Sequence, residues 1–242
     1  KNSAQAKGQD AVRMIGQSGK FNNEAKALLG DVREFLGITS LEDVRVINRY
    51  DAENITDFAF FTDKGQIYRC RGVDFDICKA SELGEFIPGK LGFDEGEAAI
   101  YMAVVEQYTG YMVFFYENGK AAKVDLSAYE TKTNRKKLIN AYSDKSPLVG
   151  VLTLSEEINV AAFSSDGRAL VFNTSLLQVK TSRVTQGVAC MSIKKKHVLT
   201  SAAPLTETAI TNLSRYRVRS LPAAGALLKD EDRGEKQLSL ID

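Results

Sequence analysis

The sequence predicts an all-β protein, built as a propeller-like array of blades of about 50 residues with a short helix near the N-terminus. A pattern of a glycine turn, an apolar strand and a basic residue occurs three times. The glycines are 54 and 48 residues apart, and the lysines that follow them are 53 and 48 apart; they are Gly65, Gly119, Gly167, Lys79, Lys132 and Lys180. A fixed period of this length with several strands per copy is typical of a radial repeat.

Each copy begins with a predicted β-hairpin. Two apolar runs flank a turn that reads Asp-Lys-Gly, Asn-Gly or Asp-Gly, in which glycine supplies the positive φ that tight hairpin loops need. The expected hairpin strands are 58–61 with 67–68, 111–115 with 121–124, and 159–163 with 169–172. Further strands are expected at 99–105, 147–154, 187–193 and 197–202.

The N-terminal part does not show this pattern. Residues 1–20 are polar and glycine-spaced, and no fixed structure is expected for them. Apolar residues at helical spacing, between an Asn-Asn cap and Gly37, predict a helix at about 23–36. A short strand is expected at 44–47.

Past Ser214 the periodicity ends, and the mixed-charge C-terminus is expected to be a disordered tail. The predicted domain organisation is therefore an N-terminal segment with one helix at 1–56, a β-domain at 57–224 and a tail at 225–242.

Composition sets limits on function. The chain has 242 residues and a formal net charge of +1, so its total charge does not mark a nucleic-acid binder. Three cysteines without paired spacing are typical of free thiols in a reducing compartment. No apolar run approaches the roughly 20 residues that cross a bilayer. We expect a cytoplasmic protein that makes no membrane contact.

Catalytic chemistry is not predicted for this chain. His197, the only histidine, lies in a lysine-rich stretch that is typical of a solvated turn. One histidine and three unpaired cysteines do not complete a zinc site. The sequence has no glycine-rich phosphate loop. We therefore expect no catalytic residue, no metal and no cofactor here.

Basic residues at equivalent positions of successive copies indicate a binding function. In a radial array such positions recur around the rim, so their charges would form an arc. Lysine and arginine attract a phosphate backbone, and Thr, Ser and Asn donate hydrogen bonds to it, without reading bases. The candidate DNA-contacting residues are Lys79, Lys132, Thr133, Arg135, Lys136, Lys137, Lys180 and Arg183. The predicted activity is non-sequence-specific, salt-sensitive DNA binding with bending. The alternative is a protein-interaction propeller whose lysines are merely solvated.

Six segments carry a resemblance to a known family: FFTDK at 60–64, DEGE at 94–97, FFYENGKAAKV at 114–124, YETKTNRKKL at 129–138, AYSDKSPLV at 141–149 and TQGV at 185–188. Through them, residues 57 to 224 resemble the C-terminal β-pinwheel domain of the A subunit of bacterial type IIA topoisomerases, DNA gyrase and topoisomerase IV.

The resemblance implies a blade array whose basic outer edge binds and bends double-stranded DNA and presents it to a strand-passage core. The implied partners are the breakage-reunion domain and the B subunit, and the implied location is the nucleoid. ATP and Mg²⁺ would serve the whole enzyme, not this chain. The family's nucleophilic tyrosine lies in the breakage-reunion domain, and Arg215-Tyr216 is not expected to replace it.

The chain departs from the family in two respects. Three blades are clear where relatives usually have five or six, and the Gln-Arg-Gly-rich box of gyrase is not found, which favours a topoisomerase IV-like or truncated domain. In addition, residues 21–55 contain EAKALL at 24–29, FLGI at 35–38 and VRVINRYD at 44–51. Through these segments they resemble the N-terminal region of phosphoribosylformylglycinamidine synthase, a purine-biosynthesis amidotransferase. A fragment of that enzyme is therefore the second hypothesis for those residues.

Overall fold

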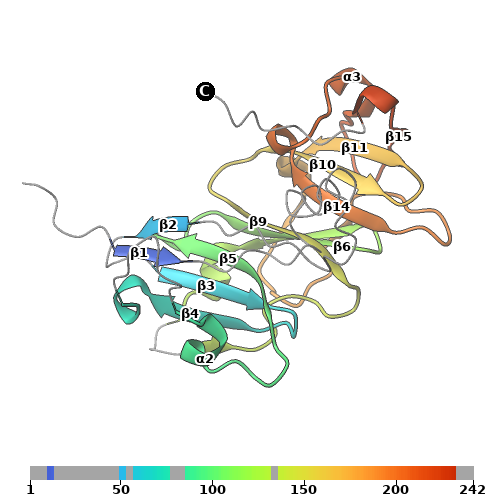
Figure 1. Cartoon of the computed structure of the whole chain (residues 1–242). Coiled ribbons are helices and arrows are strands. Elements are labelled where there is room, and N and C mark those ends of the chain that lie inside the picture. The colour runs from blue at the N-terminus through green and yellow to red at the C-terminus, as the bar shows by residue number, and fades with distance from the viewer. Residues whose placement is uncertain (1–9, 14–48, 53–56, 77–84, 132–135, 233–242) are drawn as a thin grey trace, which may run out of the picture. The chain divides into compact units, whose positions relative to one another are not determined.

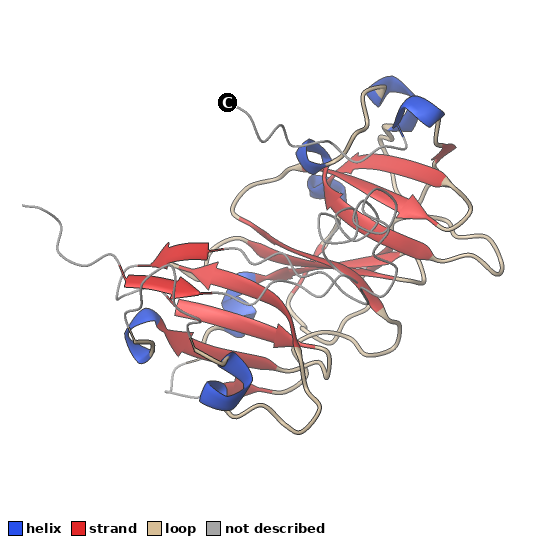
Figure 2. Cartoon of the chain, viewed as in Figure 1, coloured by secondary structure: helices blue, strands red, loops and turns tan. Residues whose placement is uncertain are grey.

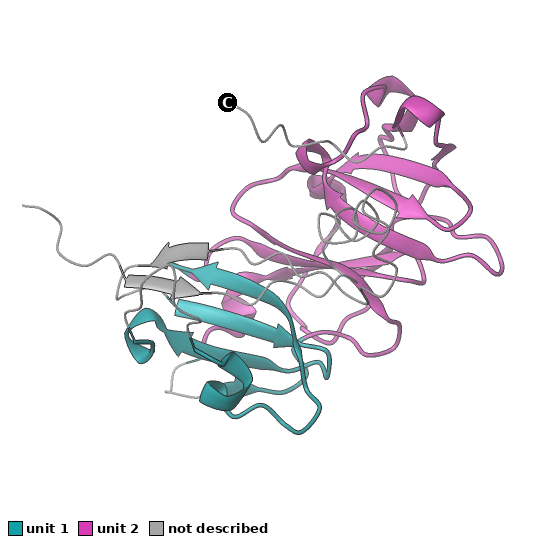
Figure 3. Ribbon diagram, viewed as in Figure 1, with its two compact units in different colours: residues 1–107, 131–141 teal, residues 108–130, 142–242 magenta. Residues whose placement is uncertain are grey.

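The computed structural model describes residues 10–13, 49–52, 57–76, 85–131 and 136–232, and their regular structure is mainly β-strand (Figures 1 and 2). The chain divides into two compact units, shown in Figure 3. Unit 1 comprises Lys1–Gln107 and Thr131–Ala141, and unit 2 comprises Tyr108–Glu130 and Tyr142–Asp242. The division differs from the predicted one because residues 131–141 return to the first sheet. None of the described helices is long and apolar enough to cross a membrane.

Unit 1 contains a four-stranded antiparallel sheet in the order β5-β3-β4-β8. Its elements are β3 (Asp57–Thr62), β4 (Ile67–Arg71), the 3-10 turn η1 (Gly72–Asp74), α2 (Ile87–Leu91), β5 (Ala99–Val105) and β8 (Lys137–Leu138). Its core consists of Phe58, Phe60, Tyr68, Cys70, Phe75 and Ile87. A separate antiparallel pair joins β1 (Asp10–Arg13) to β2 (Arg49–Ala52).

Unit 2 contains two sheets, one in the order β12-β7-β6-β9 with β13 also on β7, and the other in the order β14-β10-β11-β15. The strands are β6 (Tyr111–Tyr116), β7 (Lys120–Asp125), β9 (Leu148–Leu154), β10 (Asn159–Ser164), β11 (Arg168–Asn173), β12 (Val179–Lys180), β13 (Val188–Ala189), β14 (Leu199–Pro204) and β15 (Ala226–Leu227). The non-strand elements are η2 (Leu126–Tyr129), η3 (Thr174–Leu176), η4 (Leu205–Glu207), α3 (Leu213–Tyr216) and η5 (Asp230–Asp232). One buried core, which includes Phe115, Leu170 and Phe172, spans both sheets.

Each sheet is completed at its outer edge by a short strand from a later part of the chain. β8 follows the β6–β7 hairpin in the sequence, yet it pairs with β4, with Leu138 opposite Ile67. Likewise β13 follows β10 and β11 but pairs with β7, with Val188 opposite Ala121. β15 pairs with β11. The strands β8, β12/β13 and β15 therefore form what we call the outer edges.

The all-β repeat predicted from the sequence is confirmed. The three predicted hairpins are β3–β4, β6–β7 and β10–β11, and their turn glycines have φ of 69°, 77° and 73°. The strand expected at 187–193 is shorter, because the amides of Cys190 and Met191 both bond to the Gly119 carbonyl and turn the chain out of the sheet. The strand expected at 197–202 lies at 199–204.

The predictions for the two ends need correction. The helix at 23–36 and the strand at 44–47 lie outside the described residues. Residues 10–13 form β1, so the expectation of no fixed structure at 1–20 is wrong there. The expected tail at 225–242 is wrong for residues 226–232, because β15 pairs with β11 and Asp232 is buried and hydrogen-bonded.

At Gly187 the returning segment passes close to the backbone of β7. Its φ is +70°, and a Cβ there would lie 1.9 Å from the Ala121 carbonyl oxygen. We expect Gly187→Ala to lower the free energy of unfolding by about 3 kcal/mol, because strain and a backbone clash add together. The measurement is urea unfolding of the whole chain.

Gly167→Ala is the matched control. Its φ is +73°, but nothing lies within 4 Å of its Cβ position, so only the backbone strain of about 1 kcal/mol applies. Equal losses for the two variants would show that the close approach at Gly187 is unimportant.

Candidate nucleic-acid interface

A 3-10 turn follows the second strand of each hairpin, and after η2 and η3 the chain returns to the outer edge of the preceding sheet. A local side chain fixes these turns: Asp125 Oδ1 accepts from the Ser127 amide at 2.9 Å, and Asn173 Oδ1 accepts from the Ser175 amide at 3.0 Å. Residues of this type compete well for backbone amides at such positions. The predicted basic residues follow these turns.

Lys180 and Arg183 lie together along the outer edge of the second sheet. Lys180 is on β12, opposite Val124 of β7, and its Nζ donates to Gln178 Oε1 at 2.7 Å. Arg183 Nη1 donates to the Ala128 carbonyl at 3.1 Å. Both partners are uncharged, so each side chain keeps its positive charge while its position is fixed.

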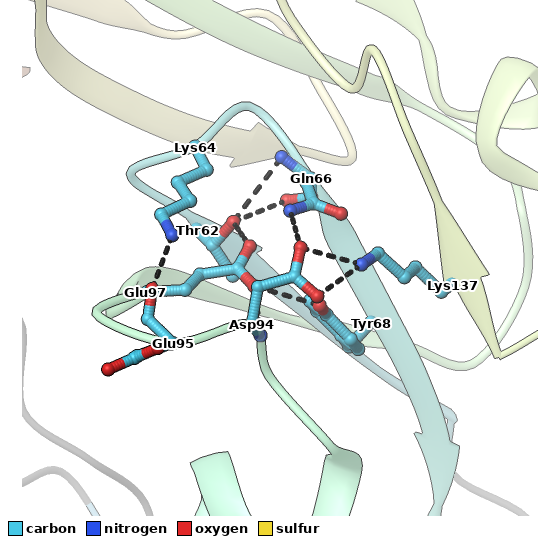
Figure 4. Close-up of polar contacts among 8 residues, drawn as sticks. All are labelled: Thr62, Lys64, Gln66, Tyr68, Asp94, Glu95, Glu97 and Lys137. Atoms are coloured by element: carbon cyan, nitrogen blue, oxygen red, sulfur yellow. Dashed lines mark hydrogen bonds and ion pairs between the residues drawn. The ribbon is translucent and has the colours of Figure 1, made fainter.

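Lys136 and Lys137, in unit 1, differ from each other. Lys136 is exposed, and its carbonyl accepts from the Arg69 amide at 2.7 Å. Lys137 Nζ lies 2.9 Å from both carboxylate oxygens of Asp94, as Figure 4 shows. The hydrogen bond to Asp94 raises the pKa of Lys137. Lys137 therefore offers a phosphate less net charge than Lys136 does.

The Asp94–Glu97 segment is a structural turn (Figure 4). Glu97 is buried and accepts from the Tyr68 hydroxyl and from the Asp94 amide, both at 2.8 Å, and also from the Thr62 hydroxyl. Hydrogen bonds from Gln66, and then from Lys137, lower the pKa of Asp94. Of the other predicted site residues, Lys79, Lys132, Thr133 and Arg135 lie outside the described residues.

Two arginines that the sequence reasoning did not select lie at the outer edge of the third sheet. Arg217 forms a parallel bridge with Val171 of β11, and Val179 pairs in the same way with Lys123 of β7. Val171 and Lys123 each lie four residues after a turn glycine, so the two pairings are equivalent. Arg217 and Arg219 are exposed, and no described carboxylate forms an ion pair with them.

A local charge count would have found these arginines. Residues 167–229 contain ten Lys and Arg residues and a single acidic residue, Glu207, which gives a formal charge of +9. The rest of the chain has a charge of −8, so the total of +1 hides the asymmetry. The whole basic segment belongs to unit 2.

Sequence comparison connects this geometry to one group of proteins. A family model described as "DNA gyrase C-terminal domain, beta-propeller" matches residues 56–83 and 159–206. The DNA gyrase A subunit of Mycoplasma genitalium is 24% identical over 160 residues, which are 66% of this chain and 19% of that protein. The same protein of Ureaplasma parvum is 23% identical over 159 residues, which are 65% of this chain and 19% of that protein. The chain thus spans about a fifth of the length of these relatives.

Solved structures show the same fold. The C-terminal domain of DNA topoisomerase IV matches with a TM-score of 0.64 and 16% identity, over 91% of this chain and 73% of that one. The E. coli ParC C-terminal domain matches with a TM-score of 0.59 and 14% identity, over 93% and 96% of the two chains. The chain is thus similar in sequence to DNA gyrase A subunits and similar in fold to the C-terminal domains of topoisomerase IV and ParC.

The buried carboxylate of Asp232 supports the segment at the outer edge of the third sheet. Asp232 accepts from the Thr211 amide at 2.8 Å, the Thr211 hydroxyl at 3.0 Å and the Tyr216 hydroxyl at 2.8 Å. The Thr211 amide makes the largest contribution to lowering the pKa of Asp232. Tyr216 is buried and lies between Arg215 and Arg217 in the sequence. Its hydrogen bond to Asp232 therefore fixes the position of the backbone that carries these arginines.

Asp232→Asn tests this contact through its pH dependence. Because the folded-state pKa is lowered, the stabilisation by Asp232 is present above the unfolded-state pKa of about 3.9 and is lost as pH falls through the folded value. We expect the variant to be less stable than the parent at pH 7, and the difference to shrink below about pH 4. Urea unfolding at pH 7, 5 and 3.5 measures it.

Glu231→Gln is the control, because the Glu231 side chain is 60% exposed and pairs only with Lys229 among the described residues. We expect a small effect from this change. A destabilisation by Asp232→Asn that is equal at pH 7 and pH 3.5 would contradict the assigned role of the charge.

Proposed function

We propose that this chain binds double-stranded DNA along the outer edges of its sheets, without reading base sequence, and bends it. The observation that carries this proposal is the composition of the outer edges of unit 2. Lys180 and Arg183 on one sheet, and Arg217 and Arg219 on the next, form no ion pair with a described carboxylate. Cations of this kind on an exposed edge attract a phosphate backbone and release its counterions.

The described helices support binding without base readout. α2 and α3 are five and four residues long, which is too short for a recognition helix in the major groove. The cations lie instead on β-strand edges and in the segments that follow 3-10 turns. A duplex that follows the edges of successive sheets in a radial repeat has to curve, and its deformability then matters more than its base contacts.

In the whole protein, the proposed role is that of an accessory domain of a type IIA topoisomerase A subunit. The domain would hold a bent DNA segment for the strand-passage core, which the breakage-reunion domain and the B subunit form. ATP hydrolysis and Mg²⁺ chemistry would belong to that core, and the location would be the cytoplasm, at the nucleoid. The two relatives, both of them DNA gyrase A subunits, support this assignment.

A salt titration of DNA binding tests the proposal. The logarithm of the association constant should fall linearly with the logarithm of salt concentration. In the triple variant Lys180→Gln, Arg217→Gln and Arg219→Gln, the slope should become less steep by about 2.7, or about 0.9 per lost phosphate contact. End-to-end energy transfer on a labelled duplex measures the bend, which should decrease in the same variant.

Lys90→Gln is the control, because Lys90, on α2 of unit 1, forms an ion pair with Glu85. Its slope should match that of the parent chain. Undetectable or salt-independent DNA binding by the parent, or an unchanged slope in the triple variant, would reject the proposal and leave the protein-interaction alternative.

A further inference from the structure

Each sheet has an equivalent turn immediately before the strand at its other edge, that is, before β5, β9 and β14. The same backbone hydrogen bond joins each of these turns to the adjacent hairpin loop. Its three occurrences are Asp63 N to Ala98 O at 3.0 Å, Glu117 N to Pro147 O at 2.9 Å, and Ser165 N to Val198 O at 2.9 Å. Residues 94–97, 143–146 and 194–197, which we call the pre-strand turns, therefore occupy one structural position.

The charge of the pre-strand turn reverses from the first sheet to the third. The turns read Asp-Glu-Gly-Glu, Ser-Asp-Lys-Ser and Lys-Lys-Lys-His, with formal charges of −3, 0 and +3. The hairpin-loop residue that faces each turn changes charge in the opposite direction, from Lys64 in the first sheet to Asp166 in the third. Lys64 Nζ donates to the Glu95 carbonyl at 2.5 Å, whereas Asp166 lies 3.6 Å from Lys194 Nζ. Asn118, the equivalent residue of the second sheet, is neutral.

The acidic turn is compensated within unit 1, but the basic turn is not compensated within unit 2. In the first sheet, Lys137 and Gln66 bind Asp94, and Tyr68 and Thr62 bind Glu97. In the third sheet, Asp166 is shared between Lys194 and Arg168, whose Nε lies 3.2 Å away. Lys195 and Lys196 are exposed, and no described carboxylate pairs with either.

The backbone of the basic turn is fixed. His197 N donates to the Lys194 carbonyl at 3.0 Å, as Glu97 N does to Asp94. Ser165 Oγ accepts from the Val198 amide at 3.0 Å and lies 3.2 Å from His197 Nδ1. Lys196 has φ of +73°. The equivalent residue of the first sheet, with φ of +67°, is a glycine, Gly96. A side chain held in the left-handed region at a cost of about 1 kcal/mol is consistent with a functional role for that side chain.

We propose that the pre-strand turn Lys194–His197 is a second DNA-contact site, separate from the outer edges, and that it binds the phosphate backbone of the same duplex. The inference rests on the proposed function. β14 and β15 lie at opposite edges of one four-stranded sheet, about 15 Å apart at the usual strand spacing. That width is close to the roughly 12 Å of a major groove, so one duplex can contact both edges with phosphates from the two sides of a groove.

The test variant combines Lys195→Gln with Lys196→Gly. Glycine suits the backbone at position 196, so unfolding by urea should show no loss of stability. The salt slope for a 40-base-pair duplex should become less steep by about 1.8, and affinity at 0.1 M salt should fall by roughly 60-fold. Lys145→Gln is the matched control, because Lys145 lies at the same turn position as Lys196 in the second sheet, next to Asp144. Its slope should not change.

The outcomes separate this inference from the proposed function. If the outer-edge triple variant reduces the slope and the turn variant does not, the second site is rejected and the proposed function stands. If the parent chain shows no salt-dependent binding, both are rejected. If the turn variant changes the oligomeric mass in light scattering but leaves the slope unchanged, the turn binds an acidic protein surface and the DNA inference is wrong.

Discussion

The pairing of each hairpin with an outer strand from a later part of the chain is the constraint on which the rest of the structure depends. Without β8, β13 and β15, the second strand of each hairpin would leave unpaired amides and carbonyls along one side, which is an aggregation hazard. The segments that supply these strands also carry Lys136, Lys180 and Arg217. Closing a sheet and placing cations on its edge are therefore achieved by the same stretch of chain.

In unit 2, the buried side chain of Lys123 also joins β7 to the segments packed beside it. Lys123 is only 1% exposed, and its Nζ pairs with Glu157, lies 3.3 Å from the Thr174 carbonyl and 4.2 Å from the Tyr111 ring centroid. Because an unpaired buried ammonium is strongly unfavourable, this arrangement holds η3 and the β9–β10 loop against β7. Arg69, at the same position in unit 1, forms an ion pair with Asp57 at 3.0 Å.

The sequence predicts the hairpins well because each hairpin is specified locally, by alternating apolar residues and a turn glycine such as Gly119. It does not predict β8 or β15, since a two-residue strand has no pattern of its own and exists only through its pairing partner. The pairing of Lys137 with Asp94 joins residues that are distant in sequence, so a count of lysines overestimates the free charge. Arg217 and Arg219 were missed because the total charge averages a basic segment against an acidic one.

Pairing with later strands also sets the order in which the chain can fold as it leaves the ribosome. Ile67 pairs with Leu138, and Ala121 pairs with Val188, and in each pair the second residue is synthesised much later than the first. The first sheet is therefore still incomplete while the second hairpin is being synthesised. A nascent chain of this kind always exposes one unfinished edge, and neighbouring nascent chains can exchange strands there. A pause in translation once residue 138 has emerged from the ribosome would allow the first sheet to close before the next edge appears.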